Sequence, residues 1–577
     1  MLYPKENACR EMKSLDGYWK FCADKENAGL DAGWGSGIGG DDIRTIGVPA
    51  SWNEQFNDLY NFHGKGWYEK DIFVPAAYES RAVYLRCGSV AGQAKVWVNG
   101  TLAAAHEGAA LPFECEISSL LKFGQENKVV ILADSTLDPW SLPPALIDES
   151  EGRVGFFHCY PAVTYDFFPY GGVQRSVWLY TTGKKRIEDI AITTDVGETA
   201  AQVHVKVALS AKVCGTVVLE SDGRRAEISV CGDTAEGSLT VENPRLWDIG
   251  QPELYDMTVT VLEDGERLDT YTETYGIRTV KVEGNQFLLN GKPVFFKGFG
   301  KHEDFYILGK GFNHALTVKD FYLLNWIGAN SFRTAHYPYD ENIMDLADRM
   351  GVLVIDETPF VGLNNRMFRP DILEKAKKVI GELFARDKNH PSVVMWSLAN
   401  EPYVSTPEAK HFFEEMASAA RSLDPTRPIT YVAHMEPEDN LAYSSYDVVC
   451  INKYYGWYIA GGQIDETLPA FAQCIQRFYD AFGKPMIISE FGADAIDGIH
   501  SDPPVMFSEE FQSDMVEKQY EELRKKDYVI GSHVWAFADF KTAQSKSRIV
   551  LNRKGVFTRD RQPKMVAHAL KRLWNEK

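Results

Sequence analysis

Two stretches of this sequence, SVVMWSLANEP at residues 392–402 and PMIISEFG at residues 485–492, carry the most information about its architecture. Each is a run of mainly apolar residues that stops at a glutamate, Glu401 in the first and Glu490 in the second. Continuous apolar runs of this length, without alternation, are typical of parallel strands that helices cover. We therefore expect both stretches to be strands of one parallel sheet, with a glutamate at the carboxyl end of each.

The rest of the sequence after Tyr275 repeats this pattern, because apolar strands alternate with helical stretches such as 372–386 and 408–423. The eight candidate strands are 294–299, 331–336, 352–357, 393–400, 429–434, 448–454, 486–491 and 529–537. Eight β/α units in about 300 residues are typical of a (β/α)8 barrel, the TIM barrel. We assign this barrel to residues 277–577 and expect its catalytic groups at the carboxyl ends of the strands.

The sequence before the barrel indicates β-structure throughout. Residues 1–180 hold short aromatic and β-branched runs between turns, and Asn99-Gly100 is a strong hairpin signal. We predict a β-sandwich of the jelly-roll type there. In residues 181–276 the strand patterns suit an immunoglobulin-like β-sandwich. These strand patterns are 187–194, 202–209, 216–220 and 255–262.

Composition narrows the class of protein. Acidic residues exceed basic ones by 81 − 61 = 20, so we expect neither a nucleic-acid partner nor an anionic membrane. We recognise no signal peptide, and nowhere do 18 apolar residues run together. The nine cysteines are scattered without a CxxC pair, which predicts free buried thiols in a reducing compartment. We therefore expect a cytoplasmic protein.

Glu401 and Glu490 end strands four and seven of the predicted barrel, so we expect them to face each other across one mouth. Hydrolysis of a glycosidic bond uses such a pair: one carboxyl group protonates the leaving oxygen, and the other attacks the anomeric carbon or activates water. Two nearby carboxylates do not easily ionise together, which keeps one of them protonated as the acid. A structural ion pair is the alternative for either glutamate alone, but not readily for both.

The two stretches resemble the catalytic segments of glycoside hydrolase family 2. The resemblance extends over essentially the whole chain and includes VWVNG (96–100), GGVQRSVWLY (171–180), LWDIGQPELY (246–255), YGIRTV (275–280) and KGFGKHED (297–304). It implies sandwich, immunoglobulin-like domain and barrel in that order, and hydrolysis with retention of anomeric configuration. It also implies Glu401 as the acid/base, Glu490 as the nucleophile and Asn400 as a hydrogen-bonding partner of the sugar 2-hydroxyl.

A basic segment after the last strand points to the sugar. Residues 547–564, SRIVLNRKGVFTRDRQPK, hold six basic side chains against one acid, which suits recognition of a C6 carboxylate; the alternative is a solvated basic loop. Asn552 and Lys554 resemble the Asn-x-Lys signature of the family 2 β-glucuronidases, and Arg548 also matches their pattern. The resemblance places five more residues at the sugar: Asp166, His336, Tyr454, Tyr458 and Trp535.

Several alternatives stay open at this point. Other family 2 activities are β-galactosidase, β-mannosidase and β-galacturonidase. The two enzymes for neutral sugars have no use for the basic segment, whereas a β-galacturonidase would need it, because its substrate also carries a carboxylate and differs at C4. A packing role is the alternative for the four aromatic residues at the predicted sugar site, and a non-catalytic carbohydrate-binding barrel is a more distant one. No cofactor or metal is expected, although His302, Glu303 and Asp304 stand together. The resemblance implies a homo-oligomer, a dimer or a tetramer.

The loop after the third predicted strand departs from the pattern of the family. It runs from Thr358 to Arg369, whereas the enteric β-glucuronidases carry a longer insertion that covers the aglycone. Loops at this end of a barrel shape its mouth. We therefore expect an open mouth, unless a neighbouring subunit or the side chains of Met367 and Phe368 close it.

Overall fold

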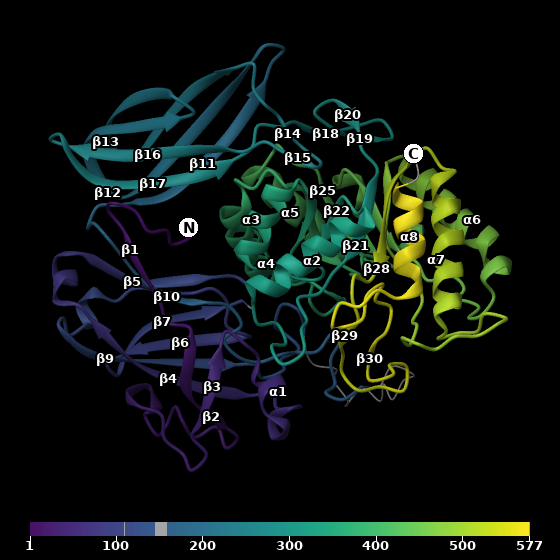
Figure 1. Cartoon of the computed structure of the whole chain (residues 1–577), viewed down its shortest axis with the longest axis horizontal. Coiled ribbons are helices and arrows are strands. Elements are labelled where there is room, and N and C mark those ends of the chain that lie inside the picture. Colours follow the sequence, from purple (N-terminus) through teal and green to yellow (C-terminus); the bar gives the residue numbers. More distant parts are fainter. Residues whose placement is uncertain (109, 145–158, 576–577) are drawn as a thin grey trace.

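The structure is a computed structural model that describes residues 1–108, 110–144 and 159–575. It contains a β-sandwich, an immunoglobulin-like sheet and a closed barrel in the predicted order, so the predicted fold class is confirmed. In Figure 1 the sandwich lies at the lower left, the immunoglobulin-like sheet at the upper left and the barrel at the right.

The sandwich consists of two antiparallel sheets with the orders β1-β10-β5-β8 and β3-β2-β4-β9-β6-β7. The hairpin predicted at Asn99-Gly100 joins β6 to β7, and both residues have positive φ, 49° and 83°, as a tight hairpin turn requires. The elements are β1 (Glu11–Ser14), β2 (Gly17–Asp24), β3 (Arg44–Val48), α1 (Trp52–Gln55), β4 (Lys65–Val74), β5 (Ala82–Cys87), β6 (Gln93–Val98), β7 (Thr101–Glu107), β8 (Phe113–Glu116), β9 (Gln125–Asp134) and β10 (Val177–Thr182).

The second unit is a five-stranded antiparallel sheet. The expected strands 202–209 and 216–220 are parts of one long strand, β12, which pairs first with β11 and later with β16. The strands are β11 (Ile187–Val196), β12 (Ala200–Ser221), β13 (Arg224–Glu242), β16 (Tyr255–Glu263) and β17 (Glu266–Tyr275). Short strands lead from this sheet to the barrel: β14 (Trp247–Asp248), β15 (Gln251–Pro252), β18 (Val280–Glu283), β19 (Gln286–Leu289) and β20 (Lys292–Pro293).

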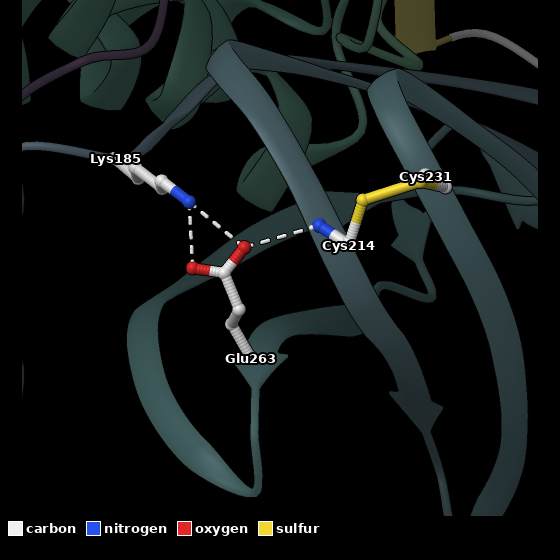
Figure 2. The surroundings of a disulfide bond; sticks show 4 residues. All are labelled: Lys185, Cys214, Cys231 and Glu263. Atoms are coloured by element: carbon white, nitrogen blue, oxygen red, sulfur yellow. Dashed lines mark hydrogen bonds and ion pairs between the residues drawn. A yellow bond between two sulfur atoms is a disulfide. The ribbon is translucent and has the colours of Figure 1, made fainter.

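A disulfide bond joins Cys214 of β12 to Cys231 of β13. The two residues are 17 apart in sequence, but the register of the strands places them opposite each other. Both are exposed, and Figure 2 shows the carboxylate of Glu263 between the backbone N–H of Cys214 and the ammonium group of Lys185. The expectation of nine free buried thiols is therefore wrong for this pair, because it ignored strand pairing.

The third unit is a closed barrel, and all eight predicted strands are confirmed. They are β21 (Phe296–Gly300), β22 (Ser331–Arg333), β23 (Leu353–Glu357), β24 (Val393–Asn400), β25 (Ile429–Ala433), β26 (Val449–Asn452), β27 (Met486–Phe491) and β28 (Val529–Trp535). All eight residues of β24 are buried, and Trp396 stacks on Phe384 of α4 at 4.0 Å between ring centroids. A helix layer outside and side chains inside explain why this strand is apolar without alternation.

The helices of the barrel are α2 (His314–Ile327), α3 (Glu341–Met350), α4 (Pro370–Asp387), α5 (Pro407–Leu423), α6 (Ile464–Phe482), α7 (Glu509–Arg524) and α8 (Met565–Asn575). In the described chain, β25 and β26 are joined by two 3-10 turns, Pro437–Asp439 and Tyr443–Ser445, in place of a helix. After β28 a small hairpin forms from β29 (Phe540–Lys541) and β30 (Leu551–Asn552). None of the helices described is long and apolar enough to span a membrane.

Candidate active site

Glu401 and Glu490 lie at the carboxyl ends of β24 and β27 and are each oriented by hydrogen bonds from other strands. Glu490 is only 4 % exposed; its Oε1 accepts from Arg333 at 2.6 Å and its Oε2 from the Tyr454 hydroxyl at 2.7 Å. Glu401 accepts from the amide group of Asn452 at 2.8 Å. The two carboxylates therefore have different surroundings, one held by a cation and a hydroxyl, the other by a neutral amide.

Asn452 links the two glutamates. Its amide nitrogen also donates to Asn400 Oδ1 at 3.2 Å, and its own Oδ1 accepts from the Ser489 hydroxyl at 2.9 Å. In the pairing of β26 with β27, Asn452 stands opposite Glu490. The hydroxyl of Ser489 donates to the amide oxygen of Asn452 and so fixes the orientation of this amide. The amide nitrogen of Asn452 therefore points at Glu401 and Asn400.

Arg333 is the centre of a buried ion network. Its Nη1 donates to both carboxylate oxygens of Glu357, at 2.7 and 2.8 Å. Glu357 also accepts from the Ser397 hydroxyl at 2.7 Å, and its Oε1 lies 2.8 Å from His336 Nδ1. Burial raises the pKa of Glu357, but Arg333 and His336 outweigh it, so the net pKa is lowered and the carboxylate stays ionised. Glu357 thereby holds the guanidinium that binds Glu490.

The groups around Glu490 shift the pKa of its carboxyl group in opposite directions. Burial raises the pKa of Glu490 above its ordinary value of 4.5, and the charge of Glu401 adds to this increase. Arg333, His336 and the Tyr454 hydroxyl lower the pKa, but they do not compensate fully. Glu490 is therefore more basic than an ordinary glutamate, which favours attack on carbon once the group is ionised.

His336 and Trp535 form an aromatic wall beside Glu490. Their rings stack with 5.0 Å between centroids, and His336 Nε2 lies 3.7 Å from Glu490 Oε1. Gly300 on β21 leaves room for this wall, because a Cβ at that position would lie 2.5 Å from the ring of Trp535. The structure thus places His336 beside the nucleophile and Trp535 against the ring of His336.

The basic segment 547–564 divides into two groups, so the prediction of one carboxylate-binding cluster is wrong for part of it. Arg548 and Lys554, with Asn552, lie near Asp166 and Tyr458. The other basic side chains bind aspartates of the barrel: Arg553 with Asp497 and Asp539, Arg559 with Asp304, Arg561 with Asp320 and Lys564 with Asp539. Those four stabilise the loop rather than face a ligand.

The remaining group surrounds a single oxygen atom. The Tyr458 hydroxyl lies 2.6 Å from Arg548 Nη2 and 2.9 Å from Lys554 Nζ. Asp166, which comes from the sandwich, binds Arg548 and accepts from the Asn552 amide at 2.9 Å. An oxygen between two cations with a planar amide nearby is the environment that a carboxylate prefers.

Among the residues around the two glutamates, Arg333, Glu357 and Asn452 were not assigned to the site from the sequence. Their position at the carboxyl ends of β22, β23 and β26 was the available signal. That signal does not show which strand-end side chains point inward, because the barrel must first close to bring their partners together.

The residues His302, Glu303 and Asp304 do not converge on a metal. His302 contacts the Tyr337 hydroxyl at 3.0 Å, whereas the two carboxylates bind Arg175 and Arg559. Among the described residues one other group, Asp345, Asp348 and His390, has its ligand atoms within 4.8 Å of one another. Burial lowers the pKa of His390, but Asp348 outweighs it and raises the pKa to about 10, so this imidazole is protonated and binds Asp348 instead.

Comparison with known proteins covers the whole chain. The matching families are "Glycosyl hydrolases family 2, sugar binding domain" at residues 12–183, "Glycosyl hydrolases family 2" at 185–278 and "Glycosyl hydrolases family 2, TIM barrel domain" at 280–577. The chain is 44% identical to a β-glucuronidase of Paenibacillus borealis, over 100% of this chain and 99% of that protein. It is 39% identical to the human β-glucuronidase, over 100% and 92%.

Solved structures agree with these relatives. The β-D-glucuronidase of Dictyoglomus thermophilum superposes with a TM-score of 0.90 at 42% identity, covering 100% of this chain and 99% of that one. The Ruminococcus gnavus β-glucuronidase in complex with D-glucaro 1,5-lactone gives a TM-score of 0.92 at 37% identity, again covering 100% and 99%.

Proposed function

Since the chain belongs to glycosyl hydrolase family 2, we propose that it is a retaining exo-β-glucuronidase, which hydrolyses β-D-glucuronides to glucuronate and an alcohol. One observation carries the proposal: two oriented glutamates share a barrel mouth with an oxygen-binding pocket made of Arg548 and Lys554. A neutral sugar has no use for the two cations, whereas a uronate does. Relatives that carry the name β-glucuronidase span the full chain.

The proposed reaction is a double displacement, with Glu490 as the nucleophile and Glu401 as the acid/base. In the first step Glu490 attacks the anomeric carbon, the glycosidic C–O bond breaks and Glu401 gives its proton to the leaving oxygen. In the second step Glu401 takes a proton from water, the water oxygen attacks the same carbon and the bond to Glu490 breaks. Arg333 and the Tyr454 hydroxyl hold the attacking carboxylate in one orientation, which reduces the cost of reaching the transition state.

The pocket around Tyr458 explains a preference for a uronate. Lys554 and Asn552 are fully buried at its base, where a C6 carboxylate of the sugar would meet them. Asp166 joins this pocket from the sandwich, which makes the first domain part of the substrate site.

Replacement of Lys554 by alanine tests the role of the pocket. A charged hydrogen bond contributes about 1.5–3 kcal/mol, and roughly 1.4 kcal/mol is a factor of ten. We expect kcat/KM for p-nitrophenyl β-glucuronide to fall roughly 10–100-fold, while any activity on the β-glucoside holds. Equal losses on both substrates would place Lys554 outside the carboxylate site.

β-Galacturonidase is the second candidate, because a galacturonate presents the same carboxylate to Arg548 and Lys554. The two activities separate in a panel of four p-nitrophenyl substrates, the β-glucuronide, β-galacturonide, β-glucoside and β-galactoside. The proposal requires the highest kcat/KM with the glucuronide. A higher value with the galacturonide, or with either neutral sugar, would replace it.

A further inference from the structure

Asp494 lies four residues after Glu490, at the point where β27 passes into its loop. It is 2 % exposed, and neither the sequence nor the catalytic scheme assigns it a role. Its Oδ2 accepts a hydrogen bond from Lys554 Nζ, and its Oδ1 accepts from the backbone N–H of Arg553 at 2.8 Å. Asp494 therefore connects the strand of the nucleophile to the segment that carries the uronate pocket.

The hydrogen bonds of Lys554 leave one donor unused. An ammonium group has three N–H donors. Within the described chain, Lys554 Nζ gives one to Asp494 and one to the Tyr458 hydroxyl at 2.9 Å. Lys554 is fully buried. The ring centroids of Tyr454, Trp457 and Tyr458 lie 5.7, 5.2 and 4.7 Å from its Nζ. These rings attract the ammonium group, but a carboxylate oxygen is the stronger acceptor for its third N–H. The third N–H is thus the one that a carboxylate of the substrate can accept.

The pocket carries no net charge. Two cations, Arg548 and Lys554, stand against two carboxylates, Asp166 and Asp494, and Arg548 Nη1 lies 3.9 Å from Asp494 Oδ2. Selectivity for an anionic sugar then rests on where the N–H groups point rather than on an excess of positive charge. Directed donors of this kind are worth more than diffuse charge in a buried site.

We propose that Asp494 is a positioning residue that determines selectivity for the uronate, because it holds the Lys554 ammonium so that its free N–H is aimed at the C6 carboxylate. This inference rests on the proposed function. Burial raises the pKa of Asp494, but Lys554 and Arg548 outweigh it and the net pKa is lowered, so the carboxylate is ionised as this role requires.

The test compares Asp494→Asn and Asp494→Ala with the unaltered enzyme on p-nitrophenyl β-glucuronide and β-glucoside. Asn keeps the shape and the acceptor for Arg553 N–H but removes the charge that orients Lys554. We expect kcat/KM for the glucuronide to fall roughly 10–100-fold in Asp494→Asn, mainly through KM, with the glucoside value unchanged. Asp494→Ala should lose at least as much.

Asp497→Asn is the matched control. Asp497 lies in the same loop and binds the guanidinium of Arg553 at 3.2 Å, but it is about half exposed and has no contact with Lys554 among the described residues. We expect this variant to keep the kinetic constants of the unaltered enzyme for both substrates.

A double variant shows whether Asp494 acts through Lys554. In the Lys554→Ala background, Asp494→Asn should cause no further loss on the glucuronide, or even a partial recovery, because the lone buried carboxylate is removed. The same loss in both backgrounds overturns the inference, as does an increase in glucuronide kcat/KM or an equal fall on both substrates in Asp494→Asn. If the unaltered enzyme itself does not prefer the glucuronide, the proposed function fails instead.

Discussion

At the scale of single residues, the raised pKa of Glu490 has a consequence for the pH dependence of the enzyme. The nucleophile works as a carboxylate, so activity falls when pH drops through its pKa. Because this pKa is raised, we expect the acidic limb of kcat/KM to have its midpoint above 4.5, the ordinary value for glutamate.

Tyr454→Phe should shift the midpoint of this acidic limb to a still higher pH. The hydroxyl of Tyr454 donates to Glu490 and lowers its pKa, so its loss makes protonation easier. A pH series of kcat/KM with p-nitrophenyl β-glucuronide measures the midpoint. Tyr455→Phe is the control, because its hydroxyl faces Cys474 rather than the nucleophile. A midpoint that stays fixed in Tyr454→Phe, or moves equally in both variants, would contradict this account.

Glu401→Ala should separate the two steps of the reaction. A p-nitrophenolate leaves with little help from an acid, whereas an alkyl alcohol needs protonation, so alkyl glucuronides should lose more. General acid–base catalysis contributes about 10²–10⁴-fold. Added azide should restore turnover of the nitrophenyl substrate, because it attacks the glycosyl-enzyme without a base. Equal losses on both substrates, without rescue by azide, would mean that Glu401 is not the acid/base.

At the scale of elements, the loop after β23 packs against the core of the barrel and against helix α5. Met367 is buried in the core of the barrel, and the ring of Phe368 lies 5.3 Å from that of Phe412 on α5. These two side chains, which the sequence left as candidates for covering the mouth, are therefore used to anchor the loop. The loop runs from the end of β23 at Glu357 to the start of α4 at Pro370, as predicted.

An open mouth predicts a particular order of substrates. Burial of apolar surface contributes about 25 cal/mol per Å². Because a short loop offers fewer apolar side chains, a small planar aglycone should gain little binding free energy at this mouth. A glucuronate that ends an oligosaccharide should enter more easily. The measurement is kcat/KM along a series from p-nitrophenyl β-glucuronide to a glucuronate-capped oligosaccharide, beside a relative with the longer loop. A steeper preference for small aglycones in this enzyme would show that the mouth is covered.

The strands of the barrel could be predicted because most are runs of mainly apolar residues, and some, such as β23 and β24, end at a polar residue. The partners of the catalytic residues could not. Asn452 and Arg333 stand at strand ends like several other polar residues, and only closure of the barrel shows that they point at Glu401 and Glu490. Asp494 was missed for the same reason, since its partner Lys554 is 60 residues away.

At the scale of the whole molecule, the sandwich is attached to the barrel close to the substrate site. Glu54 of α1 binds Lys541 of β29 at 2.8 Å, with both side chains buried, and also binds Arg559 at 3.3 Å. Asp166 reaches Arg548 and Asn552 from the same domain, but its side chain is 44% exposed. Of these contacts, the pairs of Glu54 hold the first domain on the barrel, whereas Asp166 enters the pocket.

These two contacts should respond differently to mutation. Asp166→Asn should lower kcat/KM for the glucuronide roughly tenfold or more with little change in the unfolding midpoint. Glu54→Gln should lower the midpoint clearly, because it leaves the buried ammonium group of Lys541 without its charged partner; breaking a buried pair typically costs about 3–5 kcal/mol. Calorimetry and kinetics on both variants test this. A large loss of stability in Asp166→Asn with normal kinetics would reverse the two roles.

Contacts between domains could not be predicted from patterns in the sequence. Ion pairs within the barrel are equally hard to predict: composition alone made all six cations of the basic segment candidates for the substrate, while the folded chain pairs five of them, Lys554 included, with aspartates of the barrel. Asp166 was placed only by resemblance to the family. The homo-oligomer and the cytoplasmic location stay predictions.

Trapping of the glycosyl-enzyme identifies the nucleophile. A 2-deoxy-2-fluoro-glucuronyl fluoride slows the second step and leaves the sugar on the attacking residue. After digestion, mass spectrometry should find the label on Glu490, in the peptide that contains PMIISEFG. Glu401→Ala should still be labelled there, since fluoride leaves without an acid, and Glu490→Gln should not be labelled. A label on Glu401, or on any residue other than Glu490, would contradict the account.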